Sequence, residues 1–197
     1  LFPYTTLFRS PFYYKFGMDA IAEYFRAIRA AVDLPLFLYN FPVNTGVDID
    51  VSHPAIRSIL TDGTLAGVKH TSINLGQLER IRRINPELSL FCGYEDAYLG
   101  ARAMAADGAI GSSFNFTLPI FTEVERAYAS GSMDRARELQ QNANDVTEIL
   151  AKCGLFPSIK YVLGRQGLDV GECRRPFPAL TDAQRAELDI MLARYFD

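Results

Sequence analysis

Four short apolar segments alternate with amphipathic segments over the first 110 residues, and this alternation is the strongest constraint on the fold. The apolar segments span residues 36–39, 65–69, 88–91 and 109–110. Between them, apolar residues recur at helical spacing, as at Ile21, Phe25 and Ile28. We also expect a short helix that Ser52 caps and that ends at Leu60, and a helix over residues 96–106. Strands that start roughly every 20 to 30 residues, with helices between them, are typical of parallel βαβ units and of a (β/α) barrel.

The strand pattern stops after Pro119. Four helices are predicted beyond it, at residues 120–129, 133–152, 157–165 and 182–195. Thr181 and Gln184 have the spacing of a capping box before the last helix. We therefore expect an α/β fold in which residues 11–118 form the later units of a (β/α)8 TIM barrel and residues 119–197 form a C-terminal helical region.

Composition narrows the class of protein. A chain of 197 residues can bury one sizeable core, and its net charge of −3 gives no electrostatic case for nucleic acid. No apolar run approaches the roughly 18 residues of a membrane span, and no signal peptide is visible. Three widely spaced cysteines are typical of a reducing compartment. We expect a cytoplasmic protein with neither a membrane nor a nucleic acid as partner.

Metal-dependent and serine-dependent chemistry are both poorly supported. The chain has two histidines, His53 and His70, in unrelated contexts, whereas a catalytic metal usually needs a cluster of His and carboxylate ligands. No GxSxG motif is present for a nucleophilic serine. We therefore expect no metal site.

Lys69 lies near the end of the apolar segment LAGVKHTS, residues 65–72. Burial disfavours a charged ammonium, and a neutral amine is a nucleophile that can form a Schiff base with a ketone. The alternative is a lysine that extends from a strand end to water. Tyr39 ends the preceding apolar strand, about 30 residues earlier, as expected for successive parallel strands. Both side chains would emerge at the C-terminal ends of neighbouring strands, where barrel enzymes keep their chemistry.

Four motifs in order, YNFPVNTG, GVKHTS, GYED and GAIGSSFN, resemble the pyruvate-dependent class I aldolases, the family of N-acetylneuraminate lyase and dihydrodipicolinate synthase. The resemblance runs from about Pro11 to the C-terminus. PFYYKF, AKCGLFPSIKYVL and CRRPFPAL are most similar to the lyase branch. The resemblance implies a barrel with a helical appendage and a homotetrameric full-length protein.

The resemblance also assigns chemistry. It implies that Lys69 forms a covalent Schiff base with a 2-oxo acid such as pyruvate, with no separate cofactor, and that Tyr39 transfers the proton during carbon–carbon cleavage. It implies a substrate site for a 2-oxo acid and a sugar. The residues of that site would be Thr71, Gly93, Glu95, Asp96, Ser112, Tyr13, Tyr14 and Phe156.

Structural roles remain open for several of these residues. Thr71 could close a strand, Gly93 could serve a turn, and Phe156 could belong to the core. Glu95 and Asp96 could be acids at a helix N-terminus, and the lyases have this pair in the reverse order, Asp then Glu, which leaves the sugar open. Asn44 stands where dihydrodipicolinate synthase has an arginine for an extra carboxylate, which disfavours the synthase.

Three functions are therefore considered. The first is cleavage of N-acetylneuraminate to N-acetylmannosamine and pyruvate. The second is dihydrodipicolinate synthase or another 2-oxo acid aldolase of the same family. The third is a truncated, non-catalytic homologue.

The N-terminal end is expected to be unusual. Residues 1–10, LFPYTTLFRS, do not resemble the family and are interpreted as a non-native scar, with a divergent strand as the alternative. A complete barrel needs about 250 residues, so the early strands and their carboxylate-binding loop are expected to be missing. Residues 1–197 alone are therefore expected to lack lyase activity, whereas the full-length protein is expected to be active. The strand at 36–39 would then form one open edge of the sheet.

Overall fold

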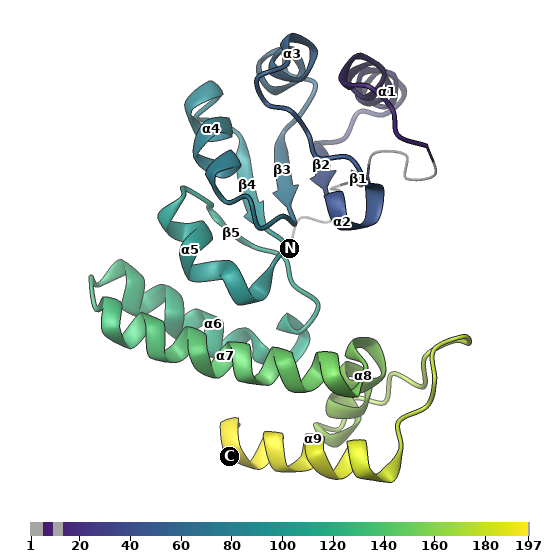
Figure 1. The fold of residues 1–197 in the computed structure, drawn as a ribbon, viewed down its shortest axis with the longest axis vertical. Helices are drawn as coiled ribbons and strands as arrows, with labels where there is room; N and C mark the ends of the chain where they lie inside the picture. The colour runs from purple at the N-terminus through teal and green to yellow at the C-terminus, as the bar shows by residue number, and fades with distance from the viewer. Residues whose placement is uncertain (1–5, 10–13, 197) are drawn as a thin grey trace. The chain divides into compact units, whose positions relative to one another are not determined.

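A parallel sheet of five strands organises the N-terminal unit, Leu1–Ile110, in the computed structural model, which describes residues 6–9 and 14–196. The strands pair in sequence order (Figure 1). They are β1 (Thr6–Arg9), β2 (Leu36–Asn40), β3 (Gly67–His70), β4 (Ser89–Cys92) and β5 (Gly108–Ala109). Sequential parallel pairing with helical crossovers is the pattern of a (β/α) barrel, which confirms the expected fold class for this part.

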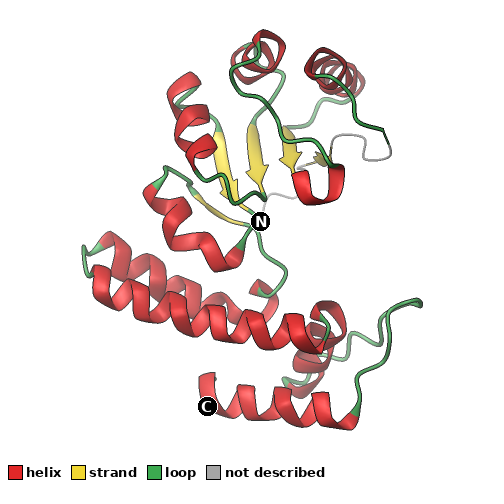
Figure 2. Ribbon diagram, in the orientation of Figure 1, coloured by secondary structure: helices red, strands yellow, loops and turns green. Residues whose placement is uncertain are grey.

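Helices connect these strands and cover one face of the sheet. α1 (Met18–Ala31), α3 (Pro54–Thr61) and α4 (Gly76–Ile84) lie along the same side of β2, β3 and β4 (Figures 1 and 2). Leu38, Val68 and Leu90 share one register line across the three strands and are fully buried in the core of this unit. Their helix partners in that core include Phe25, Ile56, Ile59, Leu78 and Ile81.

The residues that alternate with this core line face the other side of the sheet, because successive side chains of a strand point in opposite directions. Tyr39, Lys69 and Phe91 form one register line on that side, and Phe37, Gly67 and Ser89 form the line below it. The absence of a side chain at Gly67 is required here: a Cβ would lie 2.3 Å from the Phe37 ring and 2.3 Å from the backbone oxygen of Ser89.

Three local expectations were wrong. The strand expected at 36–39, which is β2, is not an edge of the sheet. β1 pairs with it from Thr6↔Leu36 to Arg9↔Tyr39. The cap of α3 is His53 rather than Ser52, since the His53 ring accepts a hydrogen bond from the amide of Ala55 at 3.3 Å. The helix expected over 96–106 is instead the 3-10 turn η1 (Glu95–Ala97) followed by α5 (Tyr98–Ala103), and Ala105 has a left-handed φ of 69° that ends it.

Residues 1–10 therefore contain a strand in their described part, Thr6–Arg9. The scar interpretation concerned the origin of this segment and stays a prediction. A parallel strand paired along its length shows that the segment can join the sheet, whatever its origin.

The helical unit, Gly111–Asp197, is built from α6 (Phe114–Ala129), α7 (Met133–Cys153), α8 (Leu155–Arg165) and α9 (Asp182–Tyr195). α6 begins before Pro119, not after it as expected, and the units divide at residue 110 rather than 118. The hydroxyls of Ser113 and Thr117 are 2.8 Å apart and fix its first turn. The capping box of Thr181 and Gln184 is confirmed.

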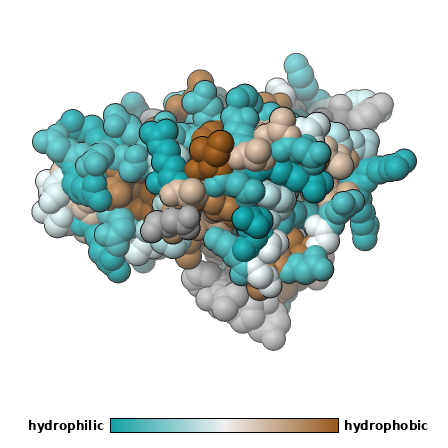
Figure 3. Space-filling view, turned by 90° about the horizontal axis from the view of Figure 1, so that it is seen from below, coloured by the Kyte–Doolittle hydropathy of each residue, from teal (hydrophilic) through white to brown (hydrophobic). Residues whose placement is uncertain are grey.

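The helices of this unit enclose a second core. Its buried members are Phe116, Val146, Leu150, Cys153, Ile159, Val162, Leu163, Leu188 and Met191. On the face drawn in Figure 3, hydrophilic residues predominate and hydrophobic ones form small patches. Within the described part of the chain, no helix combines the length and apolar character needed to cross a membrane.

Gly67→Ala should destabilise the N-terminal unit. The new Cβ meets a backbone oxygen as well as a ring, so strands must move apart, and overpacking of this kind costs about 1–3 kcal/mol. Gly76→Ala in α4 is the matched control, because its nearest neighbour would be an ordinary 3.7 Å away. Urea unfolding followed by circular dichroism measures both. Equal stabilities for the two variants would contradict the observed packing of β2, β3 and β4.

Candidate active site

Tyr39 and Lys69 lie side by side on adjacent strands. They are register partners in β2 and β3, and Lys69 Nζ lies 4.3 Å from the centroid of the Tyr39 ring. Both side chains are half-buried. A cation over an aromatic face is held by about 0.5–1 kcal/mol at exposed sites and by about 2 kcal/mol at desolvated ones. The two residues expected to perform chemistry therefore touch each other at the C-terminal edge of the sheet.

Gly93 and Thr71 complete the surroundings of the lysine. A Cβ on Gly93 would lie 1.7 Å from Thr71 Oγ1 and 3.1 Å from Lys69 Cε, so a side chain at residue 93 is incompatible with this arrangement. Thr71 is 3% exposed, and its hydroxyl has no hydrogen-bond partner among the described residues. A buried hydroxyl without a partner costs about 1–3 kcal/mol, so such a group at a site is suited to receive a ligand atom.

Backbone hydrogen bonds fix these two residues beyond the ends of the strands. The amide of Thr71 donates to the Asn40 carbonyl at 2.8 Å, and the amide of Gly93 donates to the His70 carbonyl at 2.8 Å. Each bond extends the ladder between neighbouring strands by one step. These bonds fix the backbone at the C-terminal edge of β2, β3 and β4. We call this edge, with Tyr39, Lys69, Thr71 and Gly93, the platform.

Glu95 and Asp96 form the 3-10 turn directly after Gly93 and Tyr94. Glu95 is half-buried and Asp96 is exposed. Burial raises the pKa of the neighbouring Cys92 thiol to about 11, with smaller contributions from the charges of Asp96 and Glu95, whereas Lys69 acts in the opposite direction. The carboxylates and the lysine thus lie near enough to affect one thiol electrostatically.

The structure does not bring every expected residue to this edge. Tyr14 is 65% exposed and contacts Phe16, with ring centroids 6.2 Å apart, whereas Tyr13 lies outside the described residues. Ser112 and Phe156 belong to the helical unit. Ser112 is exposed, and Phe156 meets the Phe177 ring edge-on at 5.5 Å, so Phe156 is not a core residue. Their substrate roles stay predictions.

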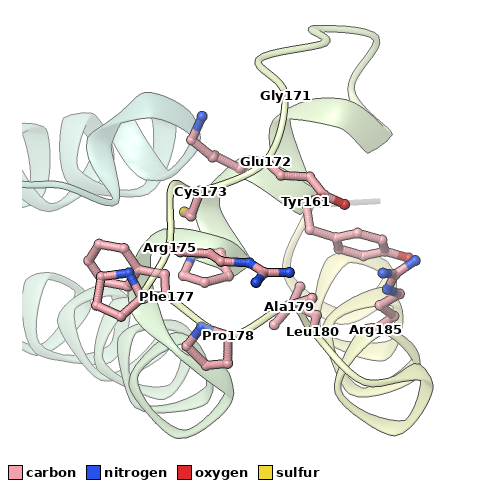
Figure 4. Close-up of a pocket in the computed structure, with 13 residues that line it drawn as sticks. Tyr161, Gly171, Glu172, Cys173, Arg175, Phe177, Pro178, Ala179, Leu180 and Arg185 are labelled. Atoms are coloured by element: carbon pink, nitrogen blue, oxygen red, sulfur yellow. The ribbon is translucent and has the colours of Figure 1, made fainter.

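A cavity of about 580 Å³ lies in the helical unit, between α8 and the segment that leads to α9 (Figure 4). Arg175 extends across it, and Tyr161 lies beside Arg185 on one wall. Neither Tyr39 nor Lys69 lines this cavity, so it is distinct from the platform. Among the described residues, no group of three or more His, Cys, Asp or Glu side chains is arranged to hold a metal ion.

Two buried polar residues were not anticipated. Asn40 and His70 directly follow Tyr39 and Lys69, and they are 2% and 0% exposed on the helix-covered face. The sequence signal was their polar character at core positions of two apolar strands. Their partners are distant in the sequence, so no local pattern reveals them.

A scan of family models matches residues 5–194 to the Dihydrodipicolinate synthetase family. The chain belongs to this family. The curated N-acetylneuraminate lyase of Rhizobium meliloti is 38% identical over 178 residues, which cover 90% of this chain and 58% of that protein. The lyase of Clostridium perfringens is 33% identical over 187 residues, covering 95% and 64%. The chain thus spans roughly three fifths of these two relatives' length.

Solved structures of this family agree with the fold. A Clostridium difficile protein, CdNal, in complex with mannosamine superposes with a TM-score of 0.90 at 31% identity, covering 96% of this chain and 65% of that one. The N-acetylneuraminate lyase of Fusobacterium nucleatum complexed with pyruvate gives 0.89 at 26% identity, covering 98% and 64%. The sheet and helices described above are therefore the later part of a (β/α)8 barrel with a C-terminal helical region.

Gly93→Ala should disrupt the platform around Lys69. The new methyl group overlaps the Thr71 hydroxyl, so Thr71 must rotate or the strand end must shift. We expect a loss of about 1–3 kcal/mol in the free energy of unfolding and displaced amide resonances for residues 69–72 in NMR spectra. Gly17→Ala, with open space around the added Cβ, is the control. Unchanged resonances for residues 69–72 would contradict the contact between Gly93 and Thr71.

Proposed function

We propose that the protein carrying this chain is a class I aldolase that cleaves N-acetylneuraminate to N-acetylmannosamine and pyruvate. The observation that carries the proposal is Lys69 Nζ against the Tyr39 ring at the C-terminal edge of adjacent parallel strands. An amine, a phenol and an unpartnered hydroxyl in one place supply a nucleophile, a proton carrier and a hydrogen-bonding group.

The proposed reaction starts at Lys69. Its neutral amine attacks the keto carbon of the open-chain sugar acid, and loss of water gives an iminium. The iminium draws electrons from the adjacent bond, so the carbon–carbon bond breaks while Tyr39 takes the proton from the departing hydroxyl. N-acetylmannosamine leaves, the enamine on Lys69 is protonated at carbon, and hydrolysis releases pyruvate and restores the amine.

The proposed substrate class rests on Glu95, Asp96 and Asn44. Two carboxylates next to Gly93 can accept hydrogen bonds from a polyhydroxylated chain. Asn44, exposed in α2 (Pro42–Thr45), has no charge to pair with the second carboxylate of a synthase substrate. The lyase names of the two curated relatives support the same choice. The alternative, another 2-oxo acid aldolase, keeps the roles of Lys69 and Tyr39.

A cytoplasmic location and a homotetramer are proposed with the function. The three cysteines are free, which is compatible with a reducing compartment. The tetramer rests on the resemblance to the family, and so do the proposed substrate contacts of Tyr13, Tyr14, Ser112 and Phe156.

In the full-length protein, borohydride reduction in the presence of pyruvate should label Lys69. Reduction converts the imine to a stable amine, which peptide mass spectrometry locates. Lys69→Arg should lose the label because a guanidinium forms no such imine, whereas Tyr39→Phe should keep it and lower kcat for cleavage by about 100- to 10,000-fold. Label on Lys15, Lys152 or Lys160 instead would refute the assignment of the Schiff base to Lys69, and the absence of any label would favour the non-catalytic alternative.

Substrate preference separates the two aldolase alternatives. We expect the protein to release pyruvate from N-acetylneuraminate at least about tenfold more efficiently than it condenses pyruvate with aspartate semialdehyde. Glu95→Gln and Asp96→Asn should raise KM for the sugar acid, whereas Glu79→Gln on α4 should not. A preference for aspartate semialdehyde would leave the aldolase chemistry intact and overturn the lyase.

A further inference from the structure

Behind the proposed catalytic pair, on the opposite face of the sheet, the next residue of each strand forms a second pair. Asn40 and His70 are register partners, and Asn40 Nδ2 lies 3.1 Å from His70 Nδ1. Both side chains are buried in the same layer as Leu38 and Val68. A polar pair in that layer is costly to bury unless its hydrogen bonds are satisfied.

The hydrogen bonds define the state of each group. Asn40 Oδ1 accepts from the Ile49 amide at 3.4 Å, so the Asn40 nitrogen faces His70 and donates to it. His70 Nδ1 must then be an acceptor, and Nε2 donates to the Asn74 carbonyl at 3.0 Å. His70 is therefore the neutral tautomer with its proton on Nε2.

The network continues into the loop after β2 and into α4. Asp48 accepts from Asn40 Nδ2 through Oδ1 at 2.7 Å and from Gln77 Nε2 through Oδ2 at 3.1 Å. Gln77 Nε2 also donates to the Ile49 carbonyl at 3.1 Å. Both hydrogens of the Asn40 amide are thus used, and β2, β3, the loop and α4 are tied together at one edge of the sheet.

The backbone carbonyls of the same pair hold two residues of the candidate site. The Asn40 carbonyl accepts from the Thr71 amide, and the His70 carbonyl accepts from the Gly93 amide. A displacement of the Asn40 and His70 side chains would therefore move Tyr39 and Lys69, their neighbours in the strands. It would also move Thr71 and Gly93, which are bonded to the two carbonyls.

We propose that Asn40 and His70 are positioning residues, whose hydrogen bond across β2 and β3 keeps Tyr39 and Lys69 in contact on the other face of the sheet. The catalytic part of this inference rests on the proposed Schiff-base function. Misplacement of reacting groups by about 1 Å can cost roughly 100-fold in rate, so a hydrogen bond that joins the ends of the two strands is able to control reactivity.

Two substitutions of His70 separate its two hydrogen bonds. His70→Asn places an amide oxygen near the position of Nδ1 and can still accept from Asn40, whereas His70→Gln places an amide nitrogen near Nε2 and keeps only the bond to Asn74. We expect the Asn variant to be trapped by pyruvate and borohydride within about threefold of the wild-type rate, and the Gln variant to be at least tenfold slower. If His70 only stabilised the fold, the two variants would have the same trapping rate.

Asn85→Ala is the control for general loss of stability. Asn85 Nδ2 donates to the Leu60 carbonyl at 2.8 Å and links α4 to α3 next to the start of β4, away from the platform. This variant should unfold at lower urea concentration, yet trap pyruvate at the wild-type rate.

A second pair of substitutions makes the test independent of residue 70. Asp48→Asn turns a nitrogen toward the Gln77 nitrogen, and Gln77→Glu turns a carboxylate toward Asp48, so each single change breaks that bond. The double variant restores a donor and an acceptor between residues 48 and 77 with their roles exchanged, and the rescue is expected to be partial because a carboxylate at residue 77 cannot donate to the Ile49 carbonyl. Its trapping rate should exceed that of either single variant, and absence of this rescue would contradict the network's role.

Acid should slow trapping more in wild type than in His70→Asn. Burial lowers the pKa of His70 below that of a free histidine, about 6.5, while the Asn74 carbonyl and Asp48 act in the opposite direction. Cys92, its register partner on β4, is neutral because burial raises its pKa to about 11. The stabilising effect of neutral His70 is therefore complete above about pH 6.5 and lost as pH falls through the lower folded pKa. The ratio of the wild-type trapping rate to that of His70→Asn should therefore decrease as pH falls below about 6.5 and through the folded pKa of His70.

A readout without chemistry separates this proposal from the proposed function. The nuclear Overhauser effect between Lys69 Hε and the Tyr39 ring protons reports their contact directly. It should be present in wild type, His70→Asn and Asn85→Ala, and lost in His70→Gln. If wild type is not labelled at Lys69 but this pattern holds, the proposed function is wrong and the positioning role is supported. If His70→Gln keeps the full effect, or traps pyruvate as fast as His70→Asn, the positioning role is wrong.

Discussion

The pairing of β2 with β3 is the interaction on which the rest of the candidate site depends. A single register places Leu38 beside Val68, Tyr39 beside Lys69 and Asn40 beside His70. Because side chains alternate between faces, the same pairing builds the core on one side and the candidate chemistry on the other. A slip of one residue would exchange those faces, so stability of the core and alignment of the amine with the phenol are selected together.

The polar pair at the end of this register explains how charged chemistry can adjoin an apolar core. Asn40 and His70 are fully satisfied by Asp48, Ile49 and Asn74, so their burial leaves no unpaired group in that network. On the opposite face, the Thr71 hydroxyl lacks a partner within the described residues. Groups whose hydrogen bonds are satisfied hold the scaffold, and the hydroxyl without a partner lies beside Gly93, next to the proposed catalytic pair.

Much of the fold could be predicted from periodicity, because strands and helices leave different apolar spacings in the sequence. The four predicted strands and the capping box at Thr181 were found within two residues of their observed positions. Local patterns failed at three places. Pro119 is tolerated inside α6, His53 rather than Ser52 caps α3, and Thr6–Arg9 pairs with β2. The Asn40 network was missed because its side-chain partners lie 8, 30 and 37 residues away.

The 3-10 turn of Glu95, Asp96 and Ala97 begins two residues after Gly93, whereas Lys69 and Tyr39 belong to strands fixed by the core and by the buried pair. The parts proposed to bind the sugar and the parts proposed to break the bond are thus separate pieces of chain. Under the proposed function, substitutions in the turn would alter the accepted aldehyde without disturbing Lys69. For the proposed enzyme, this separation would give the scaffold an evolutionary freedom: new substrate ranges could arise by changes in one short turn while the proposed reaction is inherited unchanged.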